Sequence, residues 1–292
     1  MVNAPVIFLH PIFDALCDKT EPLTAEADDL GFVWSQGEKL LVFATSREFV
    51  EDALSKSNVS VILLDESVDD DLPKIPKTVR VIRVMNAKLN FFRLHNSLRS
   101  TLRFRSSKIH ESSKIHSSAF VSPYGVSIGR DCVIEAHVSI EAGVTLQDNV
   151  IIRSGCRIGS DAMDIKEDEL GNPYMTDHLG RVEIEHDVEV GSNSVVDRSI
   201  FRQTATRVGS FTKTGSLVNI SHGVQLGARN RLASGVKICG STVIGDDNWF
   251  GPGAIVSNLL TIGSRNYVSL GSSVLTNLED DWKVVGIRIF RN

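Results

Sequence analysis

The length, composition and charge of the chain are those of an ordinary globular protein and argue against several functional classes. Its 292 residues, 42% hydrophobic and 23% charged, suffice for one large or two modest domains. No apolar run approaches the ~20 residues that a membrane span requires, and a net charge of −5 without a basic block does not suit a nucleic-acid partner. The first residues carry no basic leader, which predicts a cytoplasmic location.

Residues 1–105 are predicted to form a small α/β domain. Three apolar stretches favour strands over 39–45, 59–64 and 79–84, and a helix is expected over 46–56. Asn86 is a suitable N-cap for a second helix with apolar residues at helical spacing.

The rest of the chain repeats an aliphatic residue at every sixth position, which is the strongest pattern in the sequence. The main series is broken only by Arg202 and Thr214. Its aliphatic members are Ile184, Val190, Val196, Val208, Ile220, Leu226, Leu232, Ile238, Ile244, Phe250, Val256, Ile262, Val268 and Val274. An earlier block with the same period comprises Ile128, Ile134, Ile140, Leu146, Ile152 and Ile158, preceded with an offset of one residue by Ile109, Ile115 and Val121.

A period of six fits neither an α-helix nor an alternating strand, and it predicts a solenoid. Three hexads close a triangular coil of about 18 residues, and successive coils stack about 4.8 Å apart through backbone hydrogen bonds. The aliphatic side chains then fill the interior of the stack. We therefore expect a mainly β fold, in which a parallel β-helix over residues 106–277 follows the small α/β domain.

Two segments depart from this repeat. Residues 161–180 are predicted to form a polar loop inserted into the β-helix, with Gly171, Asn172 and Pro173 as turn formers. Long insertions in compact folds are often binding loops, so a functional role is expected, with a tolerated surface insertion as the alternative. Residues 278–292 are expected to be a short C-terminal tail outside the repeat.

One histidine of the repeat is a candidate base for acyl transfer, a reaction that also requires an oxyanion donor. His222 lies two positions after the inward residue Ile220, and the ordinary pKa of a histidine, about 6.5, suits a base. Gly240 follows one coil later, so its N–H would stand beside the imidazole as oxyanion donor, and Asn258 continues the same column. The alternatives are an exposed surface histidine and a simple corner glycine.

These motifs resemble the hexapeptide-repeat acyltransferase superfamily, and most of all its UDP-3-O-acylglucosamine N-acyltransferases. The segments that carry the resemblance are His178–Val182, Val195–Arg198, Ile220–His222 and Gly240. The resemblance implies left-handed coils, His222 as catalytic base and Gly240 as oxyanion glycine. It also implies a homotrimer with the active site between subunits.

In the N-terminal domain, the resemblance places Phe43 and Phe49 at two aromatic positions that stack on the uracil of a nucleotide. Ser46 stands where that family has an Asn near the uracil. Packing in the core of a small domain is the alternative role of the two phenylalanines.

Other positions depart from that family and favour a different acyl donor. Gly215 replaces an Asp, Leu259 replaces a second active-site histidine, and the C-terminal helices that engage acyl carrier protein are absent. The ending 284–288 is reminiscent of coenzyme A-dependent members. Arg288 and Arg291, together with Asn258, are therefore expected to bind acyl-coenzyme A, and Asn219 is expected to fix the tautomer of the base.

The sequence thus predicts an N-acyltransferase that moves an acetyl or short acyl group from coenzyme A to a UDP- or dTDP-linked amino sugar, for lipopolysaccharide or glycan assembly. No tightly bound cofactor is expected. A carbonic anhydrase-type metal site is disfavoured because His186 and His222 are expected to share a column and to lie two coils, about 10 Å, apart. The alternatives are the lipid A pathway reaction with acyl carrier protein as donor, and a non-catalytic trimeric scaffold.

Overall fold

The computed structural model describes residues 7–8, 26–35 and 37–291, which fall into two compact units. The first unit comprises Met1–Leu102 together with Met163–Asp177. The second comprises Arg103–Ala162 together with His178–Asn292. Most of the segment that we expected to be a loop of the β-helix therefore belongs to the first unit.

The first unit contains a parallel four-stranded sheet in the order β3–β4–β5–β6, with helices α2 and α3 packed against its two middle strands. Its elements outside the inserted segment are β1 (Ile7–Phe8), β2 (Glu26–Ala27), β3 (Asp29–Leu30), β4 (Leu40–Ala44), α2 (Arg47–Leu54), β5 (Val59–Asp65), β6 (Arg80–Val84), α3 (Ala87–Ser97) and the short 3-10 helix η1 (Leu98–Thr101). These bounds confirm the three strands and the helix that the apolar pattern predicts. The sheet forms because β4 and β5 are apolar almost throughout and are buried beneath the helices.

The N-cap predicted at Asn86 is also confirmed. The side chain of Asn86 accepts a hydrogen bond from the N–H of Leu89 at 3.2 Å. Its backbone lies in the left-handed region at φ 49°, which Asn adopts more readily than most residues. The same side chain therefore satisfies an unpaired helical N–H and permits the sharp entry into α3.

The inserted segment is an ordered hairpin of the first unit, which corrects the expectation of a polar loop. Its strands β16 (Ile165–Glu167) and β17 (Pro173–Met175) pair in antiparallel register. The guanidinium of Arg93 in α3 donates to both carboxylate oxygens of Glu169 at 2.6 and 2.8 Å, and Asn96 donates to the carbonyl of Met175. These contacts with α3 hold the hairpin within the first unit, so its residues do not follow the six-residue spacing.

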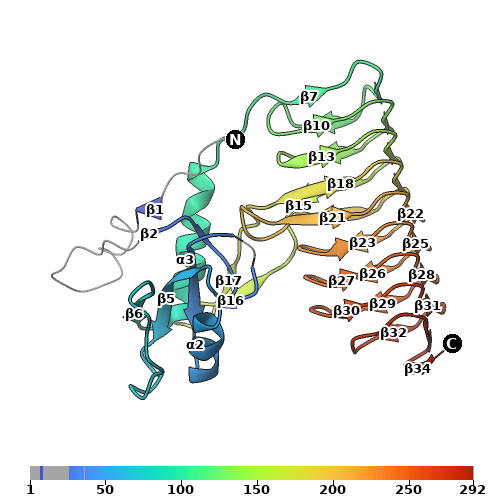
Figure 1. Ribbon diagram of the computed structural model, residues 1–292. Helices are drawn as coiled ribbons and strands as arrows, with labels where there is room; N and C mark the ends of the chain where they lie inside the picture. The colour runs from blue at the N-terminus through green and yellow to red at the C-terminus, as the bar shows by residue number, and fades with distance from the viewer. Residues whose placement is uncertain (1–6, 9–25, 36, 292) are drawn as a thin grey trace. The chain divides into compact units, whose positions relative to one another are not determined.

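The second unit is a parallel β-solenoid with a triangular coil, stacked from β7 in green to β34 in red in Figure 1. Each side of the triangle is one sheet. Sheet I consists of β7 (Lys108–Ile109), β10 (Ser127–Ile128), β13 (Val144–Leu146), β18 (Arg181–Ile184), β21 (Ala205–Val208), β24 (Gln225–Leu226), β27 (Val243–Ile244) and β30 (Thr261–Ile262). Sheet II consists of β8 (Lys114–Ile115), β11 (Val133–Ile134), β14 (Ile151–Ile152), β19 (Glu189–Val190), β22 (Lys213–Thr214), β25 (Arg231–Leu232), β28 (Trp249–Phe250), β31 (Tyr267–Val268), β33 (Trp282–Val285) and β34 (Arg288–Arg291). Sheet III consists of β9 (Phe120–Val121), β12 (Ser139–Ile140), β15 (Arg157–Ser160), β20 (Val195–Asp197), β23 (Asn219–Ile220), β26 (Lys237–Ile238), β29 (Ile255–Val256) and β32 (Ser273–Val274).

The repeat predicts the core of this solenoid correctly. In sheet III, for example, Ile220 pairs with Ile238 and Ile238 with Val256, and all three side chains are buried. Parallel pairing in register stacks like side chains in columns, so each inward residue covers the one in the coil below. The mainly β fold with a small α/β unit is therefore confirmed.

The two breaks in the series have different causes. Thr214 points inward, and its hydroxyl accepts a hydrogen bond from the N–H of Gly191 at 2.9 Å, which satisfies the polar group inside the core. Arg202 is not an inward position at all. It lies in the turn between β20 and β21, where one additional hexad lengthens the corner and leaves the frame of six unchanged.

Departures from the repeat within 109–274 gather at a single corner, the turn from a strand of sheet III to the next strand of sheet I, here called the III–I corner. The regular step is six residues, as from Ile140 to Leu146. The step is longer at this corner in three coils, between β9 and β10, between β15 and β18, and between β20 and β21. The turn that follows β23 at the same corner contains His222.

Residues 278–292 extend the solenoid, whereas we expected a tail outside it. β33 pairs in parallel register with β31, and β34 folds back against β33. Val284 is fully buried and continues the inward column of Val268. The six-residue spacing does not continue through these strands, because the last coil contains fewer residues than the others.

Candidate functional site

His222 and Gly240 are adjacent in the structure, as their one-coil spacing predicts. A Cβ added to Gly240 would lie 2.5 Å from both Cε1 and Nε2 of the His222 ring. Such a distance is far shorter than a real carbon contact, so the half-buried imidazole lies directly over the glycine. The ring takes this position only because residue 240 has no side chain.

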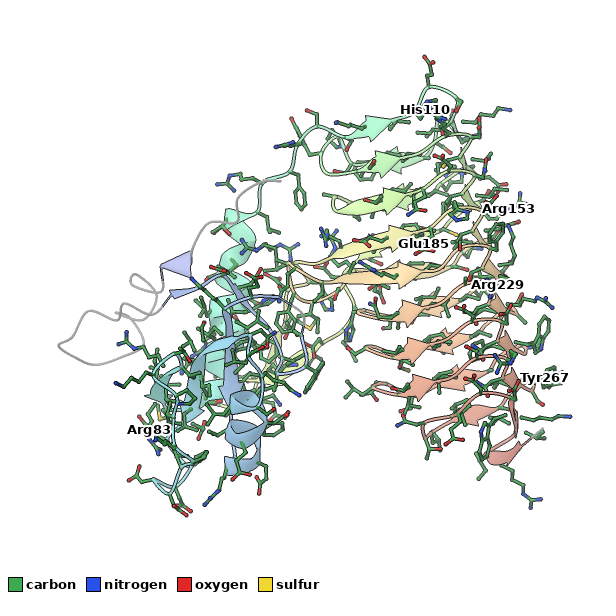
Figure 2. All side chains as sticks on the ribbon, in the orientation of Figure 1. Arg83, His110, Arg153, Glu185, Arg229 and Tyr267 are labelled. Atoms are coloured by element: carbon green, nitrogen blue, oxygen red, sulfur yellow. The ribbon has the colours of Figure 1, made fainter. Side chains whose placement is uncertain are left out.

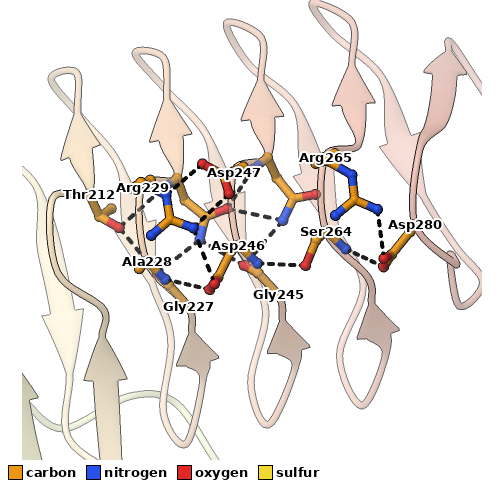
Figure 3. Close-up of polar contacts among 12 residues, drawn as sticks. Thr212, Gly227, Ala228, Arg229, Gly245, Asp246, Asp247, Ser264, Arg265 and Asp280 are labelled. Atoms are coloured by element: carbon orange, nitrogen blue, oxygen red, sulfur yellow. Dashed lines mark hydrogen bonds and ion pairs between the residues drawn. The ribbon is translucent and has the colours of Figure 1, made fainter.

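The N–H of Gly240 is uncommitted, which distinguishes it from equivalent groups at the corner between sheets I and II. Figure 3 shows that corner, where the second turn residue donates its N–H to a side chain of the next coil, as Ala228 does to Asp246 at 2.8 Å and Ser264 does to Asp280 at 2.7 Å. Among the described residues, none accepts a hydrogen bond from the N–H of Gly240. An oxyanion donor must be a backbone N–H that no protein group already occupies, and the N–H of Gly240 meets that condition.

Three polar side chains that the sequence analysis did not place here also surround this corner. The ring of His178 contacts that of His222 at a centroid distance of 5.4 Å and an interplanar angle of 70°. The Oγ atoms of Ser199 and Ser241 lie 3.7 and 3.2 Å from a Cβ built on Gly223. Counting one coil forward from Gly223 would have found Ser241, whereas the lengthened turns hide Ser199 and His178 from any periodic count.

A buried carboxyl group lies one coil before His222. Asp197 is 5% exposed, and burial raises the pKa of its carboxyl group above the usual range, while hydrogen bonds with Ser160, Asn219 and Ser221 oppose that rise. Asn219, which we expected to fix the tautomer of His222, is thus a partner of Asp197. Gly215, where the related family has an Asp, lies in the turn between sheets II and III and not at the III–I corner.

The residues predicted to stack on a nucleobase lie at the carboxyl end of β4 and in α2, within the first unit. Phe43 packs against Phe91 and Phe92 at centroid distances of 5.0 and 6.0 Å. Phe49 is 45% exposed. Ser46 caps α2 by accepting the N–H of Phe49 at 3.4 Å. Ligands of parallel α/β sheets bind at the carboxyl ends of the strands, so the position suits a nucleotide, with Phe43 partly engaged in the core.

The residues predicted to hold coenzyme A do not lie together in one chain. Asn258 is exposed at the III–I corner, where its side chain contacts the hydroxyl of Ser257. Arg288 is exposed in β34, at the end of sheet II. The side chain of Arg291 lies outside the described part of the structure. The solenoid separates these positions because a sheet and the opposite corner face different directions.

Other features of the described residues lie away from this corner. A groove of about 470 Å³ follows sheet II between Phe211 and Trp249, with Arg231 between them. Figure 2 labels Arg229 and Tyr267, which lie on the outer side of the solenoid near this groove. In the described ranges, no group of three His, Cys, Asp or Glu side chains is placed to bind a metal ion. No helix within them is long and apolar enough to cross a membrane. His186 lies in the turn between sheets I and II and, contrary to our expectation, does not share a column with His222, because the additional hexad between β20 and β21 shifts the count by one corner.

The second unit is a parallel solenoid with a six-residue repeat, and at one of its corners the His222 ring lies over Gly240, whose N–H has no acceptor among the described residues. Comparison with known proteins confirms the resemblance to the hexapeptide-repeat acyltransferase superfamily. Residues 125–160 match the family described as "Bacterial transferase hexapeptide (six repeats)".

The similar proteins of known name are acyltransferases. UDP-3-O-acylglucosamine N-acyltransferase of Anaeromyxobacter dehalogenans is 38% identical over 126 residues, which cover 41% of this chain and 35% of that protein. The enzyme of the same name from Helicobacter pylori is 28% identical over 200 residues, covering 61% and 59%. The chain therefore spans between about a third and three fifths of the curated relatives that it matches.

A solved structure supports the same fold. The UDP-N-acetylglucosamine acyltransferase of Francisella novicida superimposes with a TM-score of 0.51 at 21% identity, covering 62% of this chain and 65% of that one. At this identity the likeness concerns the solenoid and not the substrate.

Proposed function

We propose that this protein is an N-acyltransferase that moves an acyl group from a thioester to the amino group of a UDP- or dTDP-linked amino sugar. The observation that supports this best is the imidazole of His222 packed over Gly240, a residue whose backbone N–H has no acceptor among the described residues. The relatives named UDP-3-O-acylglucosamine N-acyltransferase favour a nucleotide sugar as acceptor. In the proposed enzyme, Phe49, Ser46 and Phe43 bind the nucleotide base.

In the proposed reaction, the sugar amine attacks the thioester carbonyl, and His222 accepts the proton that the nitrogen loses. The N–H of Gly240 donates to the oxyanion of the tetrahedral intermediate, which then expels the thiol with the proton returned from His222. No metal or bound cofactor is needed, because the thioester supplies the activated acyl group. The site is proposed to lie between subunits of a homotrimer, which would allow a second subunit to contribute to donor binding.

The proposed donor is acetyl-coenzyme A or a short acyl-coenzyme A, with Asn258, Arg288 and Arg291 as candidate contacts from different subunits. Acyl carrier protein is the second candidate donor, because the resemblance described in the sequence also implies it as the donor of the lipid A pathway reaction. A panel of UDP- and dTDP-linked amino sugars should be tested with several acyl-coenzyme A species and with acyl-acyl carrier protein, with release of free thiol as the readout. Turnover with one donor class assigns the donor, and no thiol release with any pair would favour a scaffold.

The role of His222 is tested with the acyl donor and amino sugar that together give the fastest turnover. His222→Ala should lower kcat by roughly 10²–10⁴, the usual effect of losing a general base, and leave the melting temperature nearly unchanged. Ile220 and Leu226 fill the core on either side, so the solenoid does not depend on this side chain. Near-normal turnover by the Ala variant would place the base elsewhere.

A further inference from the structure

A second histidine, His178, packs against His222, the proposed base. The rings of His178 and His222 meet nearly edge to face, at 5.4 Å and 70°. His178 is 1% exposed, whereas His222 is half-buried and reaches the surface of the corner. Edge-to-face pairs at this distance are attractive, so the buried ring favours one orientation of the outer one.

The backbone on either side of this contact is held firmly. His178 is the first residue of the solenoid after the inserted hairpin. The next two residues pair with the other long turn of the III–I corner, because Leu179 donates to the carbonyl of Ile200 at 2.8 Å and Gly180 donates to that of Ser199 at 2.9 Å. The side chain of Leu179 is buried as well. His178 therefore stands on a segment anchored at the corner where the proposed chemistry occurs.

The imidazole of His222 has two neighbours that constrain its orientation. Gly240 limits how far the His222 ring can tilt toward the backbone, since a Cβ built on it would lie 2.5 Å from Cε1 and Nε2. His178 limits rotation of the ring at another contact. A general base acts only when its nitrogen stays within hydrogen-bond reach of the reacting proton, so a constraint on this ring bears directly on rate.

We propose that His178 is a positioning residue whose ring, by packing against His222, holds the base over Gly240 in its reactive orientation. This inference rests on the proposed function in assigning His222 as the base. The contribution is one of shape, and the ring nitrogens of His178 are not required for it.

Two substitutions separate the shape of His178 from its nitrogens. His178→Phe keeps an aromatic ring and removes the nitrogens, and His178→Gln keeps polar atoms and removes the ring. We expect the Gln variant to lower kcat roughly 10-fold to 100-fold with both KM values nearly unchanged, as for a misplaced catalytic group, and the Phe variant to retain most of the turnover. The reverse order, or equal losses in both, would overturn the proposal. A Phe variant that fails to fold would also overturn it, because an apolar ring must fit there.

A measurement without substrate keeps this inference separate from the proposed function. Carbethoxylation of His222 by diethyl pyrocarbonate, followed by mass spectrometry of its peptide, reports how well the ring is held. The rate should rise in His178→Gln and stay near the wild-type rate in His178→Phe. His186→Gln is the matched control, since it removes a second edge-to-face histidine, packed on Phe211 at another corner. If the carbethoxylation rate is unchanged in His178→Gln, the positioning role is overturned even if acyl transfer is found. If the rate rises, the positioning role is supported even if no substrate is identified.

Discussion

At the scale of single residues, the proposed site depends on residue 240 being a glycine, which has no side chain. Gly240 has an ordinary φ, so its backbone does not require glycine. What requires glycine is the imidazole that occupies the space of a Cβ. The absence of a side chain lets the ring of His222, the proposed base, lie against the backbone of Gly240, the proposed oxyanion donor.

The requirement for glycine at position 240 can be tested by substitution. Gly240→Ala should lower kcat by about 10²–10³, because the new methyl group displaces the His222 ring and obstructs the oxyanion donor. The melting temperature should change little, since the methyl points away from the inward column. The double variant with His222→Ala measures the energetic coupling between the two residues. If the losses of activation free energy in the two single variants add up in the double variant, Gly240 acts without His222.

The buried carboxyl group of Asp197 makes the stability of the solenoid depend on pH. Because burial raises its pKa, the folded state binds the proton more tightly than the unfolded chain does. The stability from this group is present below the unfolded pKa of about 3.9 and is lost as pH rises through the raised folded pKa.

Replacing that carboxyl group should therefore remove the pH dependence that it causes. Asp197→Asn should melt at a higher temperature than the wild type near pH 8, and the difference should shrink as pH falls toward 4. Melting curves of both proteins between pH 4 and pH 8 measure the effect. A wild type that is the more stable protein at pH 8 would mean that its hydrogen bonds outweigh the cost of burial.

At the scale of elements, the turns decide what each part of the coil can do. The corner between sheets I and II is closed by ion pairs, such as Arg229 with Asp247 at 2.7 Å and Arg265 with Asp281 at 2.7 Å, and by the capped N–H groups in Figure 3. The III–I corner has longer turns and a free N–H. The strands have similar lengths on either side, so the turns distinguish the corner of the proposed site from the other one.

The end of β4 and the start of α2 offer a test in the first unit. Phe49→Ala should raise the KM for the nucleotide sugar, with a loss of about 1–3 kcal/mol for one base stack, and leave the KM for the thioester unchanged. The ring is 45% exposed, so the stability of the unit should hardly change. Phe43→Ala is the comparison, because its ring also packs on Phe91 and Phe92 and its removal should lower the melting temperature as well. Equal changes in both KM values for Phe49→Ala would argue against a stacking role.

At the scale of the whole molecule, the coils above Gly240 expose apolar side chains near the proposed site. Val243 in sheet I, Ile255 in sheet III, and Leu259 and Leu275 at the III–I corner are all exposed. Exposed apolar side chains that gather on one part of a surface are typical of an interface. Contact with a second copy of the chain would bury it beside His222, as the proposed trimer requires.

Light scattering of the protein at micromolar concentration tests this assembly directly. We expect a mass of three times 32.0 kDa. Leu259→Lys together with Leu275→Lys should shift the mass toward one chain, because a buried charge without a partner is costly. A wild-type protein that scatters as a single chain would contradict a site shared between subunits.

Much of the fold follows from the sequence because the solenoid is built from local, repeated interactions. A residue such as Ile238 is inward because its hexad folds like the hexads before and after it, and the same spacing places Gly240 next to His222. The N-cap at Asn86 is equally local. Each of these predictions needed only the distance along the chain between the residues concerned.

The tertiary structure alone decided what the interruptions of the repeat do. Nothing in the spacing indicates that 163–177 forms a hairpin on α3, that the additional hexad with Arg202 lies in a turn, or that His178 packs on His222. The turn lengths vary without changing the period of the strands, so sequence distance no longer measures spatial distance across them. The sequence by itself determined the coil, its core and the pairing of His222 with Gly240, whereas the neighbours of that pair across the long turns depend on packing between segments that no period connects.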